Sequence, residues 1–216
     1  MAVLSEHERE HIVQALGELE GSVKLVFFTQ DFECESCRHS RELLSELVAL
    51  SDKMALRVYD FEKDKEAVEK YQIDKIPALA VEGKKDYGIR YFGTPTGYEF
   101  EALLEDIVDV SRGTVKLSVE TKRELQEIDR PIHIQVFVTH TCPYCPQAVR
   151  MAHKLALVSD WIRSDMVAAV EFPHLANKYD VFAVPKVIIN EGIEFEGALP
   201  ERHFVQHVLT AMSSRT

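Results

Sequence analysis

The sequence predicts an α/β protein built from two similar halves, each a mixed four-stranded central sheet flanked by helices. Short apolar strands alternate with amphipathic helices along the whole chain. The halves also repeat their main features at an offset of 108 residues, which separates Cys34 from Cys142 and Pro77 from Pro185. An internal repeat of this length indicates a duplicated unit, and 216 residues are enough for two small domains.

In the first half we expect helix, strand, helix, strand and helix, followed by two short strands and a final helix. Ser5 and Glu8 have the spacing of a capping box and open the first helix. The predicted strands are residues 23–29, 54–60, 78–81 and 88–91. The last helix, residues 100–110, can end at Gly113. This predicts a boundary between residues 1–112 and residues 113–216.

The second half repeats this order. Thr121 and Glu124 have the spacing of a second capping box. The predicted strands are residues 132–139, 165–171, 186–190 and 194–196, and the later helices are residues 143–158, 174–179 and 200–212. Strand, helix and strand followed by a hairpin and a helix call for a mixed sheet with helices on both faces.

The composition excludes several classes of partner. Hydrophobic residues make up 46% and charged residues 28%, as in ordinary globular proteins. A formal net charge of -11 repels nucleic-acid phosphates and anionic membranes. The first ten residues lack the apolar stretch of a signal peptide, and no run reaches the ~18 apolar residues of a membrane helix. We therefore expect a cytoplasmic protein that binds neither nucleic acid nor membrane.

The four cysteines form two Cys-x-x-Cys pairs, Cys34 with Cys37 and Cys142 with Cys145. Each pair follows an apolar strand and precedes an amphipathic helix. The free N–H groups and the dipole at a helix N-terminus stabilise a thiolate, and the thiolate is the form that attacks a disulfide. Cys34 and Cys142 are therefore the predicted nucleophiles. Cys37 and Cys145, one helical turn later, are the predicted resolving thiols.

The cysteines have two other possible roles. Four thiolates can bind a structural zinc ion, but 104 residues separate Cys37 from Cys142, far more than the ~15–20 of a compact zinc ribbon. Buried cysteines can also act only as small apolar side chains. The matched separation of 43 residues from Cys34 to Pro77 and from Cys142 to Pro185 favours redox chemistry over both. No metal site is predicted.

The sequence also predicts that the two pairs are unequal. The carboxylate of Glu35, next to Cys34, opposes a neighbouring thiolate, whereas Pro143 and Tyr144 add no charge beside Cys142. Pro143 is expected in the first turn of the helix, where its fixed φ suits the position. His140, two residues before Cys142, favours the thiolate when it is protonated. Cys142 is therefore expected to ionise more readily and to dominate exchange.

The motif Cys142-Pro143-Tyr144-Cys145 has the sequence of the glutaredoxin active site, and Ala183-Val184-Pro185 looks like the segment before that family's cis-proline. With two such units, the whole chain resembles the glutaredoxin-like protein disulfide oxidoreductases, which are similar to protein disulfide isomerase. The resemblance implies two tandem thioredoxin-like folds. It also implies oxidation, reduction or isomerisation of protein disulfides by dithiol-disulfide exchange.

The resemblance assigns further site residues. Pro77 and Pro185 are expected to be cis-prolines, and Ile76 and Val184 before them are expected to hold an extended protein substrate. Tyr144 is a further expected substrate contact. No Gly-rich phosphate loop is visible, so no bound cofactor is expected besides the redox-active disulfides. Electrons would come from a thioredoxin-reductase-type flavoprotein partner.

Three competing functions remain open. A glutathione-using glutaredoxin is disfavoured by the acidic Asn190-Glu191-Gly192 segment, where that family has basic and Gly-rich contacts. A dedicated electron relay to a peroxidase would use the same cysteines with one dominant partner. A holdase or adaptor for unfolded chains would not need the cysteines.

Overall fold

The structure is a computed structural model that describes residues 3–31 and 34–213. The first half contains α1 (Glu6–Leu16), β1 (Val23–Thr29), α2 (Glu35–Val48), β2 (Met54–Asp60), α3 (Lys65–Lys70), β3 (Ala78–Glu82), β4 (Asp86–Phe92) and α4 (Tyr98–Arg112). The second half contains α5 (Val119–Gln126), β5 (Ile132–Val138), α6 (Cys145–Val158), β6 (Ile162–Ala168), α7 (Pro173–Lys178), β7 (Lys186–Ile189), β8 (Ile193–Glu196) and α8 (Glu201–Ser213). The predicted order of elements is confirmed.

The strands form one eight-stranded sheet in the order β2-β1-β3-β4-β6-β5-β7-β8. In the first half, β1 pairs with β2 in parallel and with β3 antiparallel. In the second half, β5 pairs in the same way with β6 and β7. Each half is thus the predicted mixed four-stranded sheet. The sequence did not predict that β4 pairs in parallel with β6, from Ile89 opposite Ser164 to Phe92 opposite Val167, and joins the two sheets into one.

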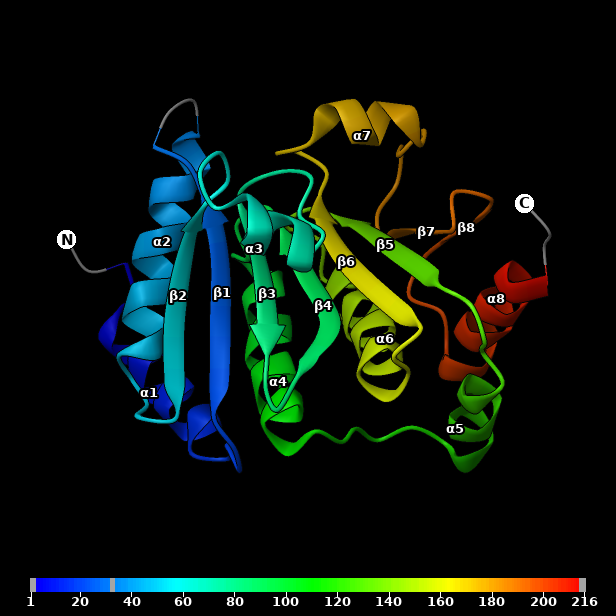
Figure 1. Ribbon diagram of the computed structural model, residues 1–216, viewed down its shortest axis with the longest axis horizontal. Coiled ribbons are helices and arrows are strands. Elements are labelled where there is room, and N and C mark those ends of the chain that lie inside the picture. The colour runs from blue at the N-terminus through cyan, green and yellow to red at the C-terminus, as the bar shows by residue number, and fades with distance from the viewer. Residues whose placement is uncertain (1–2, 32–33, 214–216) are drawn as a thin grey trace.

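Helices cover both faces of this sheet (Figure 1). Buried side chains of α1, α2, α4, α6 and α8 form one core with one face of the strands. A smaller core on the other face packs against α3 and α7. Strand β1 contributes Leu25 and Phe27 to the first core and Val26 and Phe28 to the second. Because a strand points alternate side chains to opposite faces, a strand covered on both sides is apolar along most of its length.

The N-termini of α1 and α5 show that local sequence signals predict some helix starts correctly and others wrongly. Ser5 and Glu8 form the predicted capping box of α1. The second predicted capping box is wrong, because α5 begins earlier and its N-cap is Ser118. The Ser118 hydroxyl accepts the N–H of Thr121, and the Ser118 N–H donates to Glu201 at 2.8 Å. The Glu201 carboxylate of α8 thus accepts an N–H at the N-cap, as the Glu124 carboxylate was expected to do. Gly113 follows α4 with a φ of 68°, as expected of a helix-ending glycine.

Strand β6 lies three residues earlier than predicted, at Ile162–Ala168 instead of residues 165–171. Its central residues Ser164 and Asp165 are polar yet fully buried. Asp165 accepts hydrogen bonds from His133 at 2.6 Å and from Arg163 at 2.9 Å. Buried polar side chains such as Asp165, which is paired with His133 of the neighbouring β5, break the apolar pattern from which the strand was predicted.

Candidate active site

Both cysteine pairs lie at the same edge of the sheet. The pairing directions make β1, β4, β5 and β6 run the same way. The chain leaves β1 toward Cys34 and β5 toward Cys142, so both pairs follow strand C-termini at one edge. The segment Gly93–Gly97 after β4 and the turn after β6 lie at this edge too.

The first pair forms a disulfide between Cys34 and Cys37, whose Cα atoms are 5.3 Å apart. Cys34 is the N-cap residue of α2, as predicted, and is partly exposed. Cys37 is buried in the first turn of the helix. Residues 32–33 and the side chain of Glu35 are outside the part of the chain that the structure describes. The contribution expected of the Glu35 carboxylate therefore stays a prediction.

The second pair forms a disulfide between Cys142 and Cys145, with Cα atoms 5.5 Å apart. Cys145 is the first residue of α6 and is fully buried, whereas Cys142 retains 8% of its surface. The Cys145 N–H donates to Cys142 Sγ at 3.2 Å. The prediction for Pro143 is wrong: it lies in the turn before α6, and Pro146 occupies the first helical turn instead. The helix still presents a free N–H to the predicted nucleophile.

Both predicted prolines follow cis peptide bonds, Ile76-Pro77 and Val184-Pro185. In the second half, the Val184 carbonyl oxygen lies 3.7 Å from Cys142 Sγ. The structure therefore brings together the second cysteine pair and the segment that was expected to hold substrate. In the first half, Pro77 leads into β3, and its carbonyl accepts the Gly93 N–H at 2.9 Å.

Exposed apolar side chains lie beside the second pair and along the same edge of the sheet. Tyr144, between the cysteines, is 68% exposed, and Phe182, two residues before Val184, is 89% exposed. Tyr98 and Val170 lie at the same edge of the sheet and are 51% and 70% exposed. Exposed aromatic and aliphatic side chains around a reactive group are typical of a surface that binds other proteins.

Glu99 is a candidate that the sequence analysis missed. Its side chain is fully buried in α4, and neither carboxyl oxygen has a hydrogen-bond partner in the described structure. Burial, together with the nearby charge of Asp106, raises the pKa of Glu99 to about 8. The signal was present in the sequence, because Glu99 shares a helix face with the apolar residues Leu103 and Val110.

The packing of α4 against α6 fixes where Glu99 lies along the direction of α6. The Tyr98 N–H donates to the His140 carbonyl at 3.3 Å, and further along α4, Asp106 contacts His153 of α6 at 2.5 Å. The two helices therefore run in the same direction. Glu99 lies seven residues before Asp106, and Cys145 lies eight residues before His153. Since each residue of a helix adds ~1.5 Å, Glu99 is level with the start of α6.

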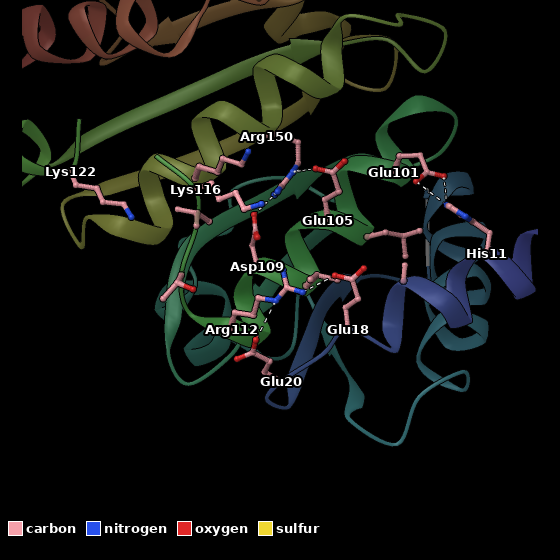
Figure 2. A pocket seen from close by; sticks show the side chains of 16 residues that line it. His11, Glu18, Glu20, Glu101, Glu105, Asp109, Arg112, Lys116, Lys122 and Arg150 are labelled. Atoms are coloured by element: carbon pink, nitrogen blue, oxygen red, sulfur yellow. Dashed lines mark hydrogen bonds and ion pairs between the residues drawn. The ribbon is translucent and has the colours of Figure 1, made fainter. Parts of the chain in front are cut away.

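A large groove elsewhere is separate from the disulfides. It has a volume of about 850 Å³ and extends over α1, α4 and the segment that follows α4. Figure 2 shows that its acidic and basic side chains largely pair with one another, as Arg112 does with Glu18 and Glu20. None of the cysteines or cis-prolines lines it.

The described residues show neither a metal centre nor a membrane span. Within residues 3–31 and 34–213, no group of three or more His, Cys, Asp or Glu side chains is arranged to bind a metal ion. Over the same residues, every helix is too short or too polar to cross a bilayer.

Comparison with known proteins finds one matching family model and several similar solved structures. Residues 132–210 match the family model described as thioredoxin domain. The solved structure of a protein disulfide oxidoreductase from Aeropyrum pernix K1 superimposes with a TM-score of 0.91 and is 31% identical, over 98% of this chain and 96% of that one. The alkylhydroperoxide reductase AhpF (C503A mutant) of Enterococcus faecalis superimposes with a TM-score of 0.89 at 21% identity, over 95% of this chain and 99% of that one.

Curated relatives are more distant and longer. An alkyl hydroperoxide reductase component from Staphylococcus aureus (strain Mu50) is 24% identical over 207 residues, which are 95% of this chain and 37% of that protein. A protein named NADH dehydrogenase from Bacillus subtilis (strain 168) is 24% identical over 185 residues, 85% of this chain and 33% of that protein. The chain thus spans about a third of the length of these relatives.

Proposed function

This chain belongs to the family of the Aeropyrum pernix protein disulfide oxidoreductase, and we propose that Cys142 and Cys145 carry most of its thiol-disulfide exchange with protein substrates. The observation that carries the proposal is the surroundings of Cys142. Its Sγ accepts the first N–H of α6 at 3.2 Å and lies 3.7 Å from the Val184 carbonyl. A helix N–H favours the thiolate, and the backbone beside it can position an extended substrate.

In the reducing direction, the Cys142 thiolate attacks one sulfur of a substrate disulfide. A mixed disulfide forms, and the other substrate sulfur leaves as a thiolate. Cys145 then loses its proton, and its sulfur attacks Cys142. The Cys142–Cys145 disulfide forms, and the second substrate sulfur leaves. The protein gives up two electrons, and two substrate sulfurs are reduced. The same steps in reverse oxidise a substrate dithiol.

We propose that Glu99 accepts the Cys145 proton. A general base works best when its pKa lies near the working pH, and burial raises the pKa of Glu99 to about 8. Its unpaired oxygens leave it free to take up a proton. On this proposal, residues 1–112 and 113–216 are two units. The first unit supplies the Glu99 carboxylate to the thiol-disulfide exchange that the second unit carries out.

Substrate contacts are proposed for Val184, Pro185 and Tyr144 in the second half and for Ile76 and Pro77 in the first. The exposed Tyr144 and Phe182 support the second set, because apolar side chains beside the second pair favour unfolded or partly folded protein segments. Cys34 and Cys37 are proposed as a second redox pair that uses the same chemistry. We place the reaction in the cytoplasm, with electrons supplied by a flavoprotein reductase.

The test is insulin reduction and reactivation of scrambled ribonuclease by wild type, Cys34→Ser and Cys142→Ser. The second pair should dominate, so Cys142→Ser should lose most of the turnover and Cys34→Ser little. Alkylation rates of the two cysteines, measured separately against pH, should show the larger thiolate fraction at Cys142. A greater loss of turnover in Cys34→Ser, or a zinc stoichiometry without an oxidisable pair, would contradict the proposal.

A relay to a peroxidase is the second candidate, and the matches to the alkyl hydroperoxide reductase proteins favour it. Both functions use the same thiols and differ in the acceptor. A Cys145→Ser protein cannot resolve its mixed disulfides, so it retains its partners. Trapping many client proteins supports general exchange, whereas trapping one dominant peroxidase supports the relay.

A further inference from the structure

The segment Gly93–Gly97 connects the surroundings of the two cysteine pairs. On the first side, the Thr94 hydroxyl lies 2.9 Å from the Ser40 hydroxyl of α2. Ser40 in turn donates to the Ser36 carbonyl, between the first two cysteines, at 2.9 Å. The Gly93 N–H donates to the Pro77 carbonyl. This segment of the first half is therefore fixed against the first pair.

The same segment contacts the loop that carries Cys142. Thr96 Oγ1 lies 3.2 Å from His140 Nδ1, and the Thr94 N–H donates to Glu171 Oε1 at 2.6 Å. His140 Nε2 lies 3.7 Å from the same Glu171 oxygen. Gly97 has a φ of 64°, and a Cβ there would collide with the His140 carbonyl oxygen. The close approach thus requires glycine.

These contacts fix the His140 ring from two sides. When the ring is protonated, both nitrogens are donors. Thr96 offers an acceptor to one of them, and the Glu171 carboxylate lies near the other. His140 is two residues before Cys142, so their Cα atoms are at most about 7 Å apart. A positive charge on the loop that carries the cysteine stabilises its thiolate.

We propose that Glu171 and Thr96 are positioning residues that hold protonated His140 where it stabilises the Cys142 thiolate. The proposal rests on the function proposed above for Cys142, and it makes the second redox site composite, since Thr96 comes from the first half. Glu171 acts only through His140. The negative charge of Glu171 opposes the Cys142 thiolate. In a protein that already lacks His140, replacing Glu171 should therefore leave the fraction of Cys142 thiolate unchanged or raise it.

The test is the alkylation rate of Cys142 against pH in the reduced full chain, followed by mass spectrometry of the Cys142 peptide. The variants are His140→Gln, Glu171→Gln and the double variant. Gln retains an acceptor for the Thr94 N–H. Other titratable groups on the packed elements include Tyr98 and Glu99 of α4, His39 of α2, which lines one pocket with Thr96 and Gly97, and the Cys145 thiol. They are the same in every variant, so they do not affect the comparison.

At pH 6.5, each single variant should slow alkylation of Cys142 about threefold or more, and the double variant should be no slower than His140→Gln. Cys34 in the same samples serves as the internal control and should not change. Thr96→Val should slow the alkylation of Cys142, and Thr96→Ser should restore the wild-type alkylation rate. An equal slowing by Glu171→Gln with and without His140 would mean a merely structural role and would overturn the proposal.

The failure of this proposal can be told apart from failure of the proposed function. If Cys142→Ser retains insulin reduction, Cys142 is not the main nucleophile, whatever its alkylation rate. If Cys142→Ser is inactive but His140→Gln alkylates at the wild-type rate at every pH, Cys142 keeps its role and the positioning by Glu171 and Thr96 is disproved.

Discussion

Glu99 shows how a single residue acquires a chemical role from its surroundings. In an exposed helix, a glutamate at this position would be an ordinary first-turn acid. Here the side chain is fully buried and its oxygens have no partner among the described residues. Burial and the Asp106 charge therefore raise its pKa to about 8. A carboxyl group that titrates near neutral pH can both accept and return a proton.

Glu99→Gln should change how stability depends on pH. The folded pKa of Glu99 lies above its unfolded value, so the protonated form is preferred by the fold. Its stabilising effect is fully present below about pH 4.3 and is lost as the pH rises through about 8. Wild type should lose stability across this window with a slope of up to ~1.4 kcal/mol per pH unit. Glu99→Gln should lack this slope.

Urea unfolding at several pH values between 4 and 9 measures the effect. Glu105→Gln is the matched control, because Glu105 lies in the same helix and is 65% exposed. Glu99→Gln should also slow resolution of the mixed disulfide at Cys142 while leaving the first attack unchanged. Identical pH slopes in wild type and Glu99→Gln would show that the carboxyl titrates normally.

At the scale of elements, a buried polar network joins α4 to α6. Asp106 of α4 accepts from Tyr91, and it contacts both Arg150 and His153 of α6. Burial alone would raise the pKa of Asp106, but the Arg150 and His153 charges and the hydrogen bonds from His153 and Tyr91 hold it below its usual range. The carboxylate is therefore ionised, and it compensates the buried Arg150 guanidinium.

Asp106→Ala should cost about 3–5 kcal/mol, because it leaves the buried Arg150 without its main partner. Asp109→Ala is the control: Asp109 also pairs with Arg150 but keeps 17% of its side-chain surface, whereas Asp106 keeps 1%, so its loss should cost less than that of Asp106. Denaturant unfolding at pH 7 gives both values. A loss of less than about 1 kcal/mol in Asp106→Ala would mean that the network does not hold the two helices together.

At the scale of the whole molecule, the two halves share one sheet. Parallel pairing of β4 with β6 covers an edge that each half would otherwise expose. Side chains of both halves also belong to the same core on the side of α4 and α6. The repeat in the sequence therefore describes two similar units within one continuous structure.

We therefore expect thermal unfolding in a single transition, with equal calorimetric and van't Hoff enthalpies. Gly93→Ala should lower its midpoint, because Gly93 has a φ of 99° and a Cβ there would meet Ala168 and Glu171. Differential scanning calorimetry measures both. Two separate transitions, with only one sensitive to Gly93→Ala, would show that the halves unfold independently.

Much of the fold and part of the candidate site followed from the sequence. The bounds of β1 and β2 and the Ser5 capping box were predicted correctly, because apolar periodicity and capping are local signals. The cysteine pairs and the two proline positions were found from their spacing in the chain. Both pairs form disulfides, and both prolines follow cis bonds.

Which residues of the two halves contact each other could be learned only from the tertiary structure. The cap of α5, the shifted β6, and Glu99 level with the start of α6 all depend on contacts between residues far apart in the chain. The contacts of Thr96 and Glu171 with His140 do so as well. Local patterns determine which segments become strands and helices. Packing between the halves determines which buried groups meet, because burial and charge depend on neighbours that the sequence order does not reveal.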